Sequence, residues 1–140
     1  MSTTAELGRA HRYQLPGDTP YDLTILTWAN GTYLSLRAQR RLEVEHGIRC
    51  LVVDLRWIAP MPIDDMVDTA EATGRVLIVD ETRRSGGVGE GITAALVERG
   101  VGATISRVAA ADSFVPLGAA ANLVLVSEDD IMAAAVRSVR

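Results

Sequence analysis

One stretch, RVLIVDETRRSGGVGEGITAALVERGVGATISRV (residues 75–108), contains a complete strand–helix–strand unit. Its first apolar run, Val76–Val79, is short and continuous, which is typical of a strand covered on both faces. After a glycine-rich loop over 81–87, apolar residues recur at helical spacing over 88–96. A second strand is predicted at Thr104–Val108. The unit therefore predicts two parallel strands joined by a crossover helix.

The same alternation of apolar strands and amphipathic helices continues on both sides of this unit. Further strands are predicted at Leu23–Thr27 and Cys50–Val53, helices at 32–46, 63–70 and 127–139, a short edge strand at His11–Leu15, and a turn at Asn30-Gly31. Repeated strand–helix units with apolar central strands imply an α/β protein with three α/β/α layers and an open, mostly parallel sheet. We predict a single domain over residues 11–140, preceded by a loosely ordered leader over residues 1–10.

The charge composition excludes several classes of protein. The chain has 140 residues, a formal net charge of −4 and 14 basic residues, all of them arginine. Without lysine there is no Walker A phosphate loop and no Schiff-base nucleophile. An acidic chain without a basic run does not have the surface of a nucleic-acid-binding protein, and no apolar run reaches the roughly 20 residues of a membrane span. Frequent alanine and the use of arginine in place of lysine favour a GC-rich bacterial source.

Cysteine and histidine are scarce. A single cysteine, Cys50, excludes an internal disulfide framework, and with only two histidines the sequence argues against a structural zinc site. Because Cys50 lies in an apolar strand, we expect an inert core thiol. The first residues carry no basic-then-apolar export signal, so the predicted location is cytoplasmic.

The glycine-rich loop after Val76–Val79 has two interpretations. Backbone amides at the start of the following helix could bind an anion such as phosphate. Alternatively, Gly86 and Gly87 form a tight turn while Gly89 and Gly91 let the helix lie close to the sheet. The spacing G-G-x-G-x-G does not match the dinucleotide-binding fingerprint, so we favour a structural role or a subunit contact.

Charged residues near two strand ends are candidates for an interface. Glu81 could form an ion pair with Arg83 or Arg84, and Arg84 could meet an acidic group of a partner through a bidentate contact. Asp54 and Arg56 are either a functional pair at the sheet edge or a structural pair that fixes the loop. The predicted interface or loop residues are Arg56, Glu81, Arg84, Gly86 and Gly87. No catalytic, cofactor-binding or metal-binding residue is predicted.

Four motifs occur in an order that resembles a known family. They are DLTILT (22–27), DLRWIAPMP (54–62), TGRVLIVDE (73–81) and RSGGVGE (84–90). Together they resemble the C-terminal domain of the transketolase superfamily. The most similar members are the β subunits, or β halves of fused chains, of thiamine-diphosphate-dependent 2-oxoacid dehydrogenases. The resemblance covers about Arg12 to Val139.

This resemblance implies a five-stranded sheet of order 1-3-2-4-5, with the His11–Leu15 strand antiparallel to the others. It implies that thiamine diphosphate and Mg are held by other domains of the parent enzyme, so this chain alone would bind neither. In the family this domain packs about a molecular two-fold axis, and in β subunits it helps to dock the lipoyl acyltransferase component. Gly102 stands here in place of the acidic residue that often helps in that docking.

These observations lead to one preferred reading and one alternative. We predict a non-catalytic assembly domain that forms a two-fold dimer with itself and joins the thiamine-binding domains or subunits of a larger enzyme. The resemblance implies that the parent decarboxylates a 2-oxoacid oxidatively and transfers the acyl group to a lipoyl group. The alternative is a stand-alone α/β module that binds a small anionic ligand at the Gly86–Gly91 loop. A reading frame that continues upstream of Met1 into thiamine-binding domains would favour the first.

Overall fold

The computed structural model describes residues 4–140, which form a five-stranded sheet of order β1-β3-β2-β4-β5. The strands are β1 (His11–Tyr13), β2 (Leu23–Thr27), β3 (Cys50–Asp54), β4 (Arg75–Arg83) and β5 (Thr104–Ala110). The helices are α1 (Asn30–His46), α2 (Ile63–Thr73), α3 (Val88–Glu98), the 3₁₀ helix η1 (Gly118–Leu123) and α4 (Glu128–Val139). Of the five described strands only β1 runs antiparallel, pairing with β3 in the register His11 to Asp54, so the predicted strand order and directions are confirmed.

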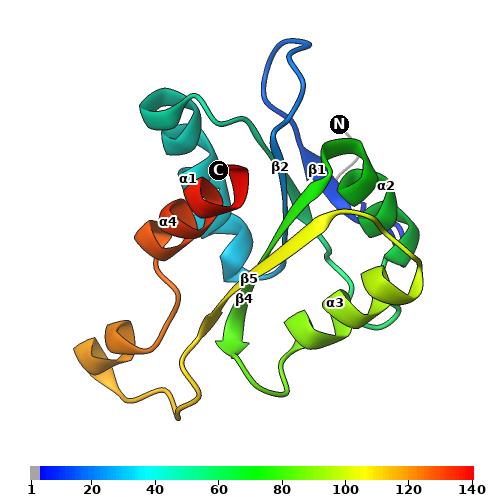
Figure 1. The fold of residues 1–140 in the computed structure, drawn as a ribbon. Coiled ribbons are helices and arrows are strands. Elements are labelled where there is room, and N and C mark those ends of the chain that lie inside the picture. Colours follow the sequence, from blue (N-terminus) through cyan, green and yellow to red (C-terminus); the bar gives the residue numbers. More distant parts are fainter. Residues whose placement is uncertain (1–3) are drawn as a thin grey trace.

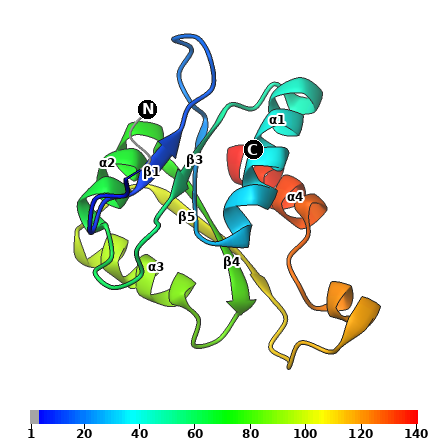
Figure 2. The ribbon, with the colours of Figure 1, turned by 180° about the vertical axis from the view of Figure 1, so that it is seen from behind.

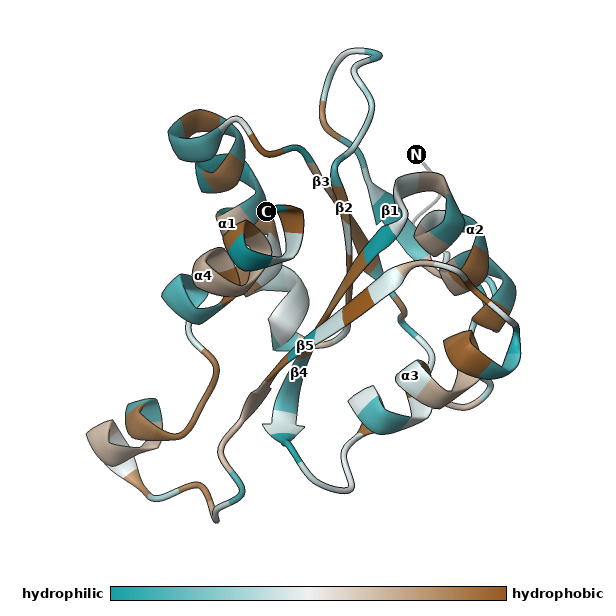
Figure 3. Ribbon diagram, viewed as in Figure 1, coloured by the Kyte–Doolittle hydropathy of each residue, from teal (hydrophilic) through white to brown (hydrophobic). Residues whose placement is uncertain are grey.

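Helices cover both faces of the sheet, as the apolar strands predicted. Helices α1 and α4 lie on one face and α2 and α3 on the other (Figures 1 and 2). Successive residues of a strand point to opposite faces. On β4, Leu77 therefore packs with α1 and α4, whereas Val76 and Ile78 pack with α2 and α3. Figure 3 shows apolar residues, in brown, along the central strands between the helices.

The helix ends explain why the chain turns where it does. Gly47 and Gly74 follow α1 and α2 in the left-handed conformation, with φ of 65° and 68°, which glycine adopts without a Cβ penalty. Helix α4 begins with a capping box in which Ser127 and Asp130 satisfy each other's backbone amides. The cap at Gly47 and the start of the last helix at Ser127 match the sequence prediction.

Two predicted loops are shorter than expected. The prediction of a turn at Asn30-Gly31 is wrong, because α1 already begins at Asn30. Strand β4 continues to Arg83, so the glycine-rich loop covers residues 84–87 rather than 81–87. The extension is made by a register shift between Asp80 and Arg83, after which Arg83 pairs with Ala110 of β5.

The end of the predicted leader is anchored to α2. Arg9 donates from Nε and Nη2 to the Asp65 carboxylate at 3.0 and 2.8 Å, and the Ala10 amide donates to it at 2.8 Å. Burial opposes ionisation of Asp65, but these donors outweigh that effect and the pKa of Asp65 is lowered. Residues 1–3 of the predicted leader lie outside the described residues.

Cys50, the first residue of β3, is buried completely within the sheet. Burial raises the pKa of its thiol to about 12, with a smaller contribution from the nearby Asp22 carboxylate. This agrees with the predicted core thiol. In the described part of the chain, none of the helices is both long and apolar enough to cross a membrane.

Candidate functional site

The site lies at the carboxyl edge of the sheet, where the loop after β4 meets the segment after β5. Asp80, near the end of β4, has no exposed surface and organises this loop. One carboxylate oxygen accepts from the Thr82 amide at 2.8 Å and from Thr82 Oγ1 at 2.6 Å, and the other accepts from the Gly89 amide at 2.7 Å. The N-cap of α3 is Gly87, which has no side chain to accept a hydrogen bond from the first amides of the helix. The Asp80 carboxylate on β4 accepts from one of these amides, that of Gly89, instead.

Three glycines of this loop and helix behave differently from one another. Gly86 has φ of 71°, a left-handed conformation that suits the tight turn predicted at Gly86 and Gly87. Gly87 has an ordinary φ of −87°, but a Cβ there would lie 2.5 Å from Thr82 Oγ1 and 2.7 Å from the Arg83 carbonyl oxygen. Gly87 is therefore required by close packing rather than by its backbone conformation. The expectation that Gly91 serves close packing is wrong, because a Cβ there would meet no atom within 4 Å.

Several backbone amides of the loop and of the start of α3 are already occupied. The Ser85 amide donates to Asp112 at 2.8 Å, and the Gly86 amide donates to Glu90 at 3.0 Å. With the Gly89 amide bound to Asp80, three of the donors that an anion would need face carboxylates of this chain. The geometry therefore offers no support to the alternative of an anion site at Gly86–Gly91.

Ser85 and Asp112 clip the β4–α3 loop to the segment after β5. Ser85 donates both its hydroxyl, at 2.7 Å, and its amide to the Asp112 carboxylate, and these bonds lower the pKa of Asp112. Beyond the clip, residues 111–124, which we call the apolar arm, extend away from the sheet and carry η1 (Figure 1). The two ends of the arm are joined by a hydrogen bond of 3.0 Å from the Ala111 amide to the Val124 carbonyl.

Large apolar side chains on this arm are exposed. Phe114 and Leu117 are each 96% exposed, and Leu123 is 86% exposed. Phe114 also borders an open depression of about 520 Å³ that Arg83, Ser85 and Asp112 line. Large apolar side chains exposed along one segment make that segment a candidate for a contact with another protein.

The structure separates the predicted charged residues. Glu81 accepts from Asn30 Nδ2 at 3.2 Å, while Arg83 donates to the Ser85 carbonyl at 2.9 Å. Within the described residues Glu81 forms no ion pair with Arg83 or Arg84, so that predicted pair is wrong. Instead Glu81 lies beside the start of α1, near Gly31.

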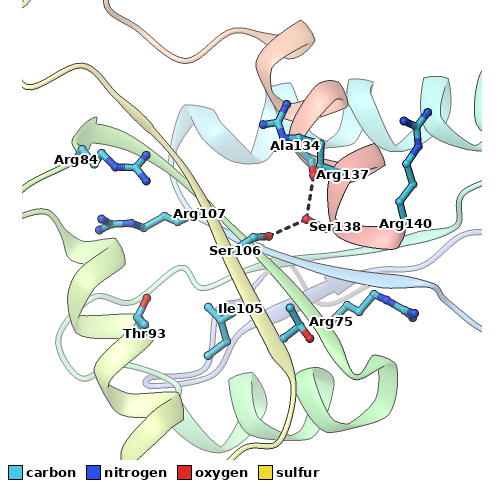
Figure 4. Close-up of a pocket in the computed structure, with 11 residues that line it drawn as sticks. Arg75, Arg84, Thr93, Ile105, Ser106, Arg107, Ala134, Arg137, Ser138 and Arg140 are labelled. Carbon is cyan, nitrogen blue, oxygen red and sulfur yellow. Dashed lines mark hydrogen bonds between the residues drawn. The ribbon is translucent and has the colours of Figure 1, made fainter.

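The side chains of Arg56 and Arg84 take part in other contacts. Arg56 has φ of 59°, its amide donates to Asp54 at 3.0 Å, and its Nε lies 3.8 Å from the same carboxylate, which supports the structural pair that fixes the loop. Arg84 lines a groove beside β5, together with Arg107 (Figure 4). Gly86 and Gly87 thus share the candidate site with the arm, whereas Arg56 lies elsewhere and Arg84, although it is in the same loop, directs its side chain to the groove beside β5.

Residues 18–131 match the family model described as the transketolase C-terminal domain. The chain belongs to the transketolase C-terminal domain family. The domain is 38% identical over 114 residues to the protein named pyruvate dehydrogenase E1 component subunit beta of Staphylococcus aureus, and the match covers 79% of this chain and 35% of that protein. The protein of the same name from Staphylococcus epidermidis matches to the same extent. The chain therefore spans about a third of the length of these relatives.

Solved structures agree with this assignment. The domain superposes with a TM-score of 0.83 and 26% identity on a structure titled split gene transketolase, inactive beta4 tetramer, covering 96% of this chain and 43% of that one. A 2-oxoglutarate:ferredoxin oxidoreductase from Magnetococcus marinus superposes with a TM-score of 0.65 at 17% identity, over 94% of this chain and 20% of that one, and shares the fold.

The residues that sequence reasoning missed in this transketolase C-terminal domain are Asp80, Asp112 and the apolar side chains of the arm. Asp80 carried a usable signal, because a carboxylate near the end of a buried strand stood before a helix with a glycine N-cap. Asp112 carried no such signal in the sequence, because its partner Ser85 is 27 residues away. Among the described residues no group of three His, Cys, Asp or Glu side chains is placed to hold a metal ion.

Proposed function

We propose that this domain is a non-catalytic assembly domain of a cytoplasmic, thiamine-diphosphate-dependent 2-oxoacid dehydrogenase. Its contacts with a second copy, and with the thiamine-binding domains or subunits of the parent, are made through the apolar arm. The observation that carries the proposal is the exposure of Phe114, Leu117 and Leu123. In this reading thiamine diphosphate and Mg are bound elsewhere in the parent, which decarboxylates a 2-oxoacid and passes the acyl group to a lipoyl group.

The energetics of the arm favour association. Burying a large apolar side chain stabilises a complex by about 1.5–3 kcal/mol, so three such side chains supply enough to offset part of the entropy of association. The arm is also held before any partner arrives, because the Ser85–Asp112 clip and the Ala111–Val124 hydrogen bond fix its base. A pre-ordered surface loses less conformational entropy on binding than a flexible one.

The relatives support an assembly role in this enzyme class. The curated relatives carry the name of a component subunit of pyruvate dehydrogenase, and one structural relative is titled as a tetramer of β chains. The parent reaction and the two-fold dimer follow from the family resemblance. The apolar arm is the feature of this chain that fits such contacts.

Sedimentation velocity on the intact chain tests the proposal. We expect the wild-type chain to form dimers or larger species from the low micromolar range upward. The double variant Phe114→Ser/Leu117→Ser should shift that transition to at least tenfold higher concentration. A matched control is Val44→Ser on α1, which removes a side chain that is 85% exposed and lies outside the arm.

Two results would contradict the proposal. The first is a wild-type chain that stays monomeric up to submillimolar concentration. The second is self-association that the arm variant and the Val44→Ser control change equally.

A further inference from the structure

Five arginines line one groove beside the outer strand of the sheet. The groove has a volume of about 780 Å³ and lies along β5 (Figure 4). Its arginines come from the start of β4, the β4–α3 loop, β5, α4 and the residue after α4: Arg75, Arg84, Arg107, Arg137 and Arg140. Since Thr93 of α3 and Ala134 of α4 also line it, the groove spans the edge of β5 between the two helical layers.

Most of the positive charge of the groove has no ion-pair partner: among the described residues, only Arg107 of the five arginines lies within 4.0 Å of a carboxylate, that of Glu90. None of its lining residues in the described part of the chain is Asp or Glu, although the whole chain carries a net charge of −4. Arg107 Nη1 is buried without a hydrogen-bond acceptor among the described residues, and the Glu90 carboxylate lies 4.0 Å from it. A guanidinium in this state favours an incoming carboxylate or phosphate oxygen.

The groove is long as well as cationic. In the parallel pairing of β4 with β5, Arg75 lies opposite Thr104 and Ile78 lies opposite Arg107. Along the strand direction, Arg75 on β4 and Arg107 on β5 are therefore offset by three residues, which corresponds to roughly 10 Å. One phosphate ion is too small to meet both ends. An elongated ligand with several anionic groups fits this spacing.

The edge of β5 adds a second feature. β5 is the last strand of the sheet order, so one side of its backbone pairs with no strand in the described residues. A hydrogen bond of 2.7 Å between Ser106 and Ser138 joins β5 to α4, and within α4 Ser138 also donates to the Ala134 carbonyl at 2.9 Å (Figure 4). The unpaired edge therefore offers backbone donors and acceptors to a further strand.

We propose that β5 and the five-arginine groove bind an extended acidic segment of a partner protein by strand addition. Main-chain hydrogen bonds to β5 would hold the segment, and its carboxylates would meet the arginines. A second copy of this chain does not fit, because edge-to-edge pairing of two β5 strands would bring ten arginines together. The groove includes no residue of the apolar arm, so this proposal can be tested independently of the proposed assembly role.

Fluorescence polarisation with labelled peptides tests this site on the intact chain. The probe is an eight-residue peptide of alternating Glu and Val, with an isosteric Gln/Val peptide and an N-methylated Glu/Val peptide as comparisons. We expect the Glu/Val peptide to bind, and each comparison peptide to bind at least tenfold more weakly. Amide hydrogen exchange of Thr104–Ala110 should slow only when the Glu/Val peptide is present.

Two matched variants locate the binding. Arg137→Glu should weaken binding of the Glu/Val peptide at least fivefold. Arg40→Glu makes the same change in net charge on an exposed residue of α1 and should weaken it less than twofold. Equal effects of the two variants would overturn the proposal, as would equal affinity for the N-methylated peptide. Tripolyphosphate that binds while the Glu/Val peptide does not would also overturn it, because the groove would then be a site for small polyanions.

Discussion

Gly87 and Gly91 lie four residues apart and should respond in opposite ways to the same substitution. Gly87→Ala places a Cβ against Thr82 Oγ1, the Arg83 carbonyl and the Asp80 carboxylate, so we expect a loss of about 1–3 kcal/mol in the free energy of unfolding. Gly91→Ala adds a methyl group to an open position in α3 and should raise that free energy by roughly 0.5–1 kcal/mol. Urea unfolding followed by circular dichroism measures both changes. Equal effects at the two positions would contradict the close-packing role of Gly87.

Arg84 provides a further test at the residue scale. Its side chain is exposed and borders the five-arginine groove. Arg84→Ala should leave the free energy of unfolding within about 0.5 kcal/mol of the wild-type value, as is usual for surface positions. The same variant should weaken binding of the acidic peptide. A loss of stability as large as that of Gly87→Ala would make Arg84 a residue of the fold instead.

Among the helices and strands, the contact of the leader with α2 should depend on pH. The pKa of Asp65 is lowered in the folded chain, whereas an unfolded aspartate has a pKa of about 3.9. The carboxylate therefore stabilises the fold above the unfolded value, and this contribution is lost as the pH falls through the lowered folded value. Asp65→Asn should cost roughly 1–2 kcal/mol near neutral pH, because hydrogen bonds to a buried carboxylate are lost.

Thermal unfolding between pH 7 and pH 3 would measure this effect. The difference in Tm between Asp65→Asn and the wild-type chain should shrink below about pH 4. Asp64→Asn is the matched control, because the neighbouring Asp64 side chain is 87% exposed and pairs only at the surface with Arg99. A pH-independent difference for Asp65→Asn would show that the Arg9 contact is not electrostatic in origin.

The strands and helices were predictable from local patterns, whereas several of their ends were not. Continuous apolar runs at β2, β3 and β4 and the caps at Gly47 and Ser127 required only neighbouring residues. Asn30-Gly31 is a common turn sequence, but here both residues belong to the first turn of α1, where a Cβ on Gly31 would clash with Thr27 Oγ1 of β2. The last residues of β4 are polar and read as a loop, but pairing of Arg83 with Ala110 keeps them in the strand.

The candidate site was predictable only in part, for the same reason. Gly86 and Gly87 were found because glycines in a strand-to-helix loop indicate special backbone or packing demands. The arm carries apolar side chains that normally predict a core, so sequence alone gave no reason to expect Phe114 and Leu117 at the surface. Arg84 was found as a charged residue just after a strand, but the groove that its side chain lines brings together residues from β4, β5 and α4, which are far apart in the sequence.

For the molecule as a whole, we expect folding without cofactor. Both faces of the sheet are covered and two separate apolar clusters are closed by helices of this chain, so the melt should be cooperative. Because the family resemblance places the cofactor in other domains, titration calorimetry should detect no binding of thiamine diphosphate with Mg. Stoichiometric, Mg-dependent binding would contradict this expectation, and a broad, non-cooperative melt would contradict independent folding.

The rate at which the buried Cys50 thiol reacts with a reagent measures how often the folded chain opens. It is the only cysteine in the sequence, and both its burial and its raised pKa protect it from thiol reagents while the sheet is closed. An aromatic disulfide reagent would therefore modify only molecules whose sheet has transiently separated. The labelling rate in native buffer, divided by the rate for the denatured chain, then reports the population of open molecules for each variant without any attached probe.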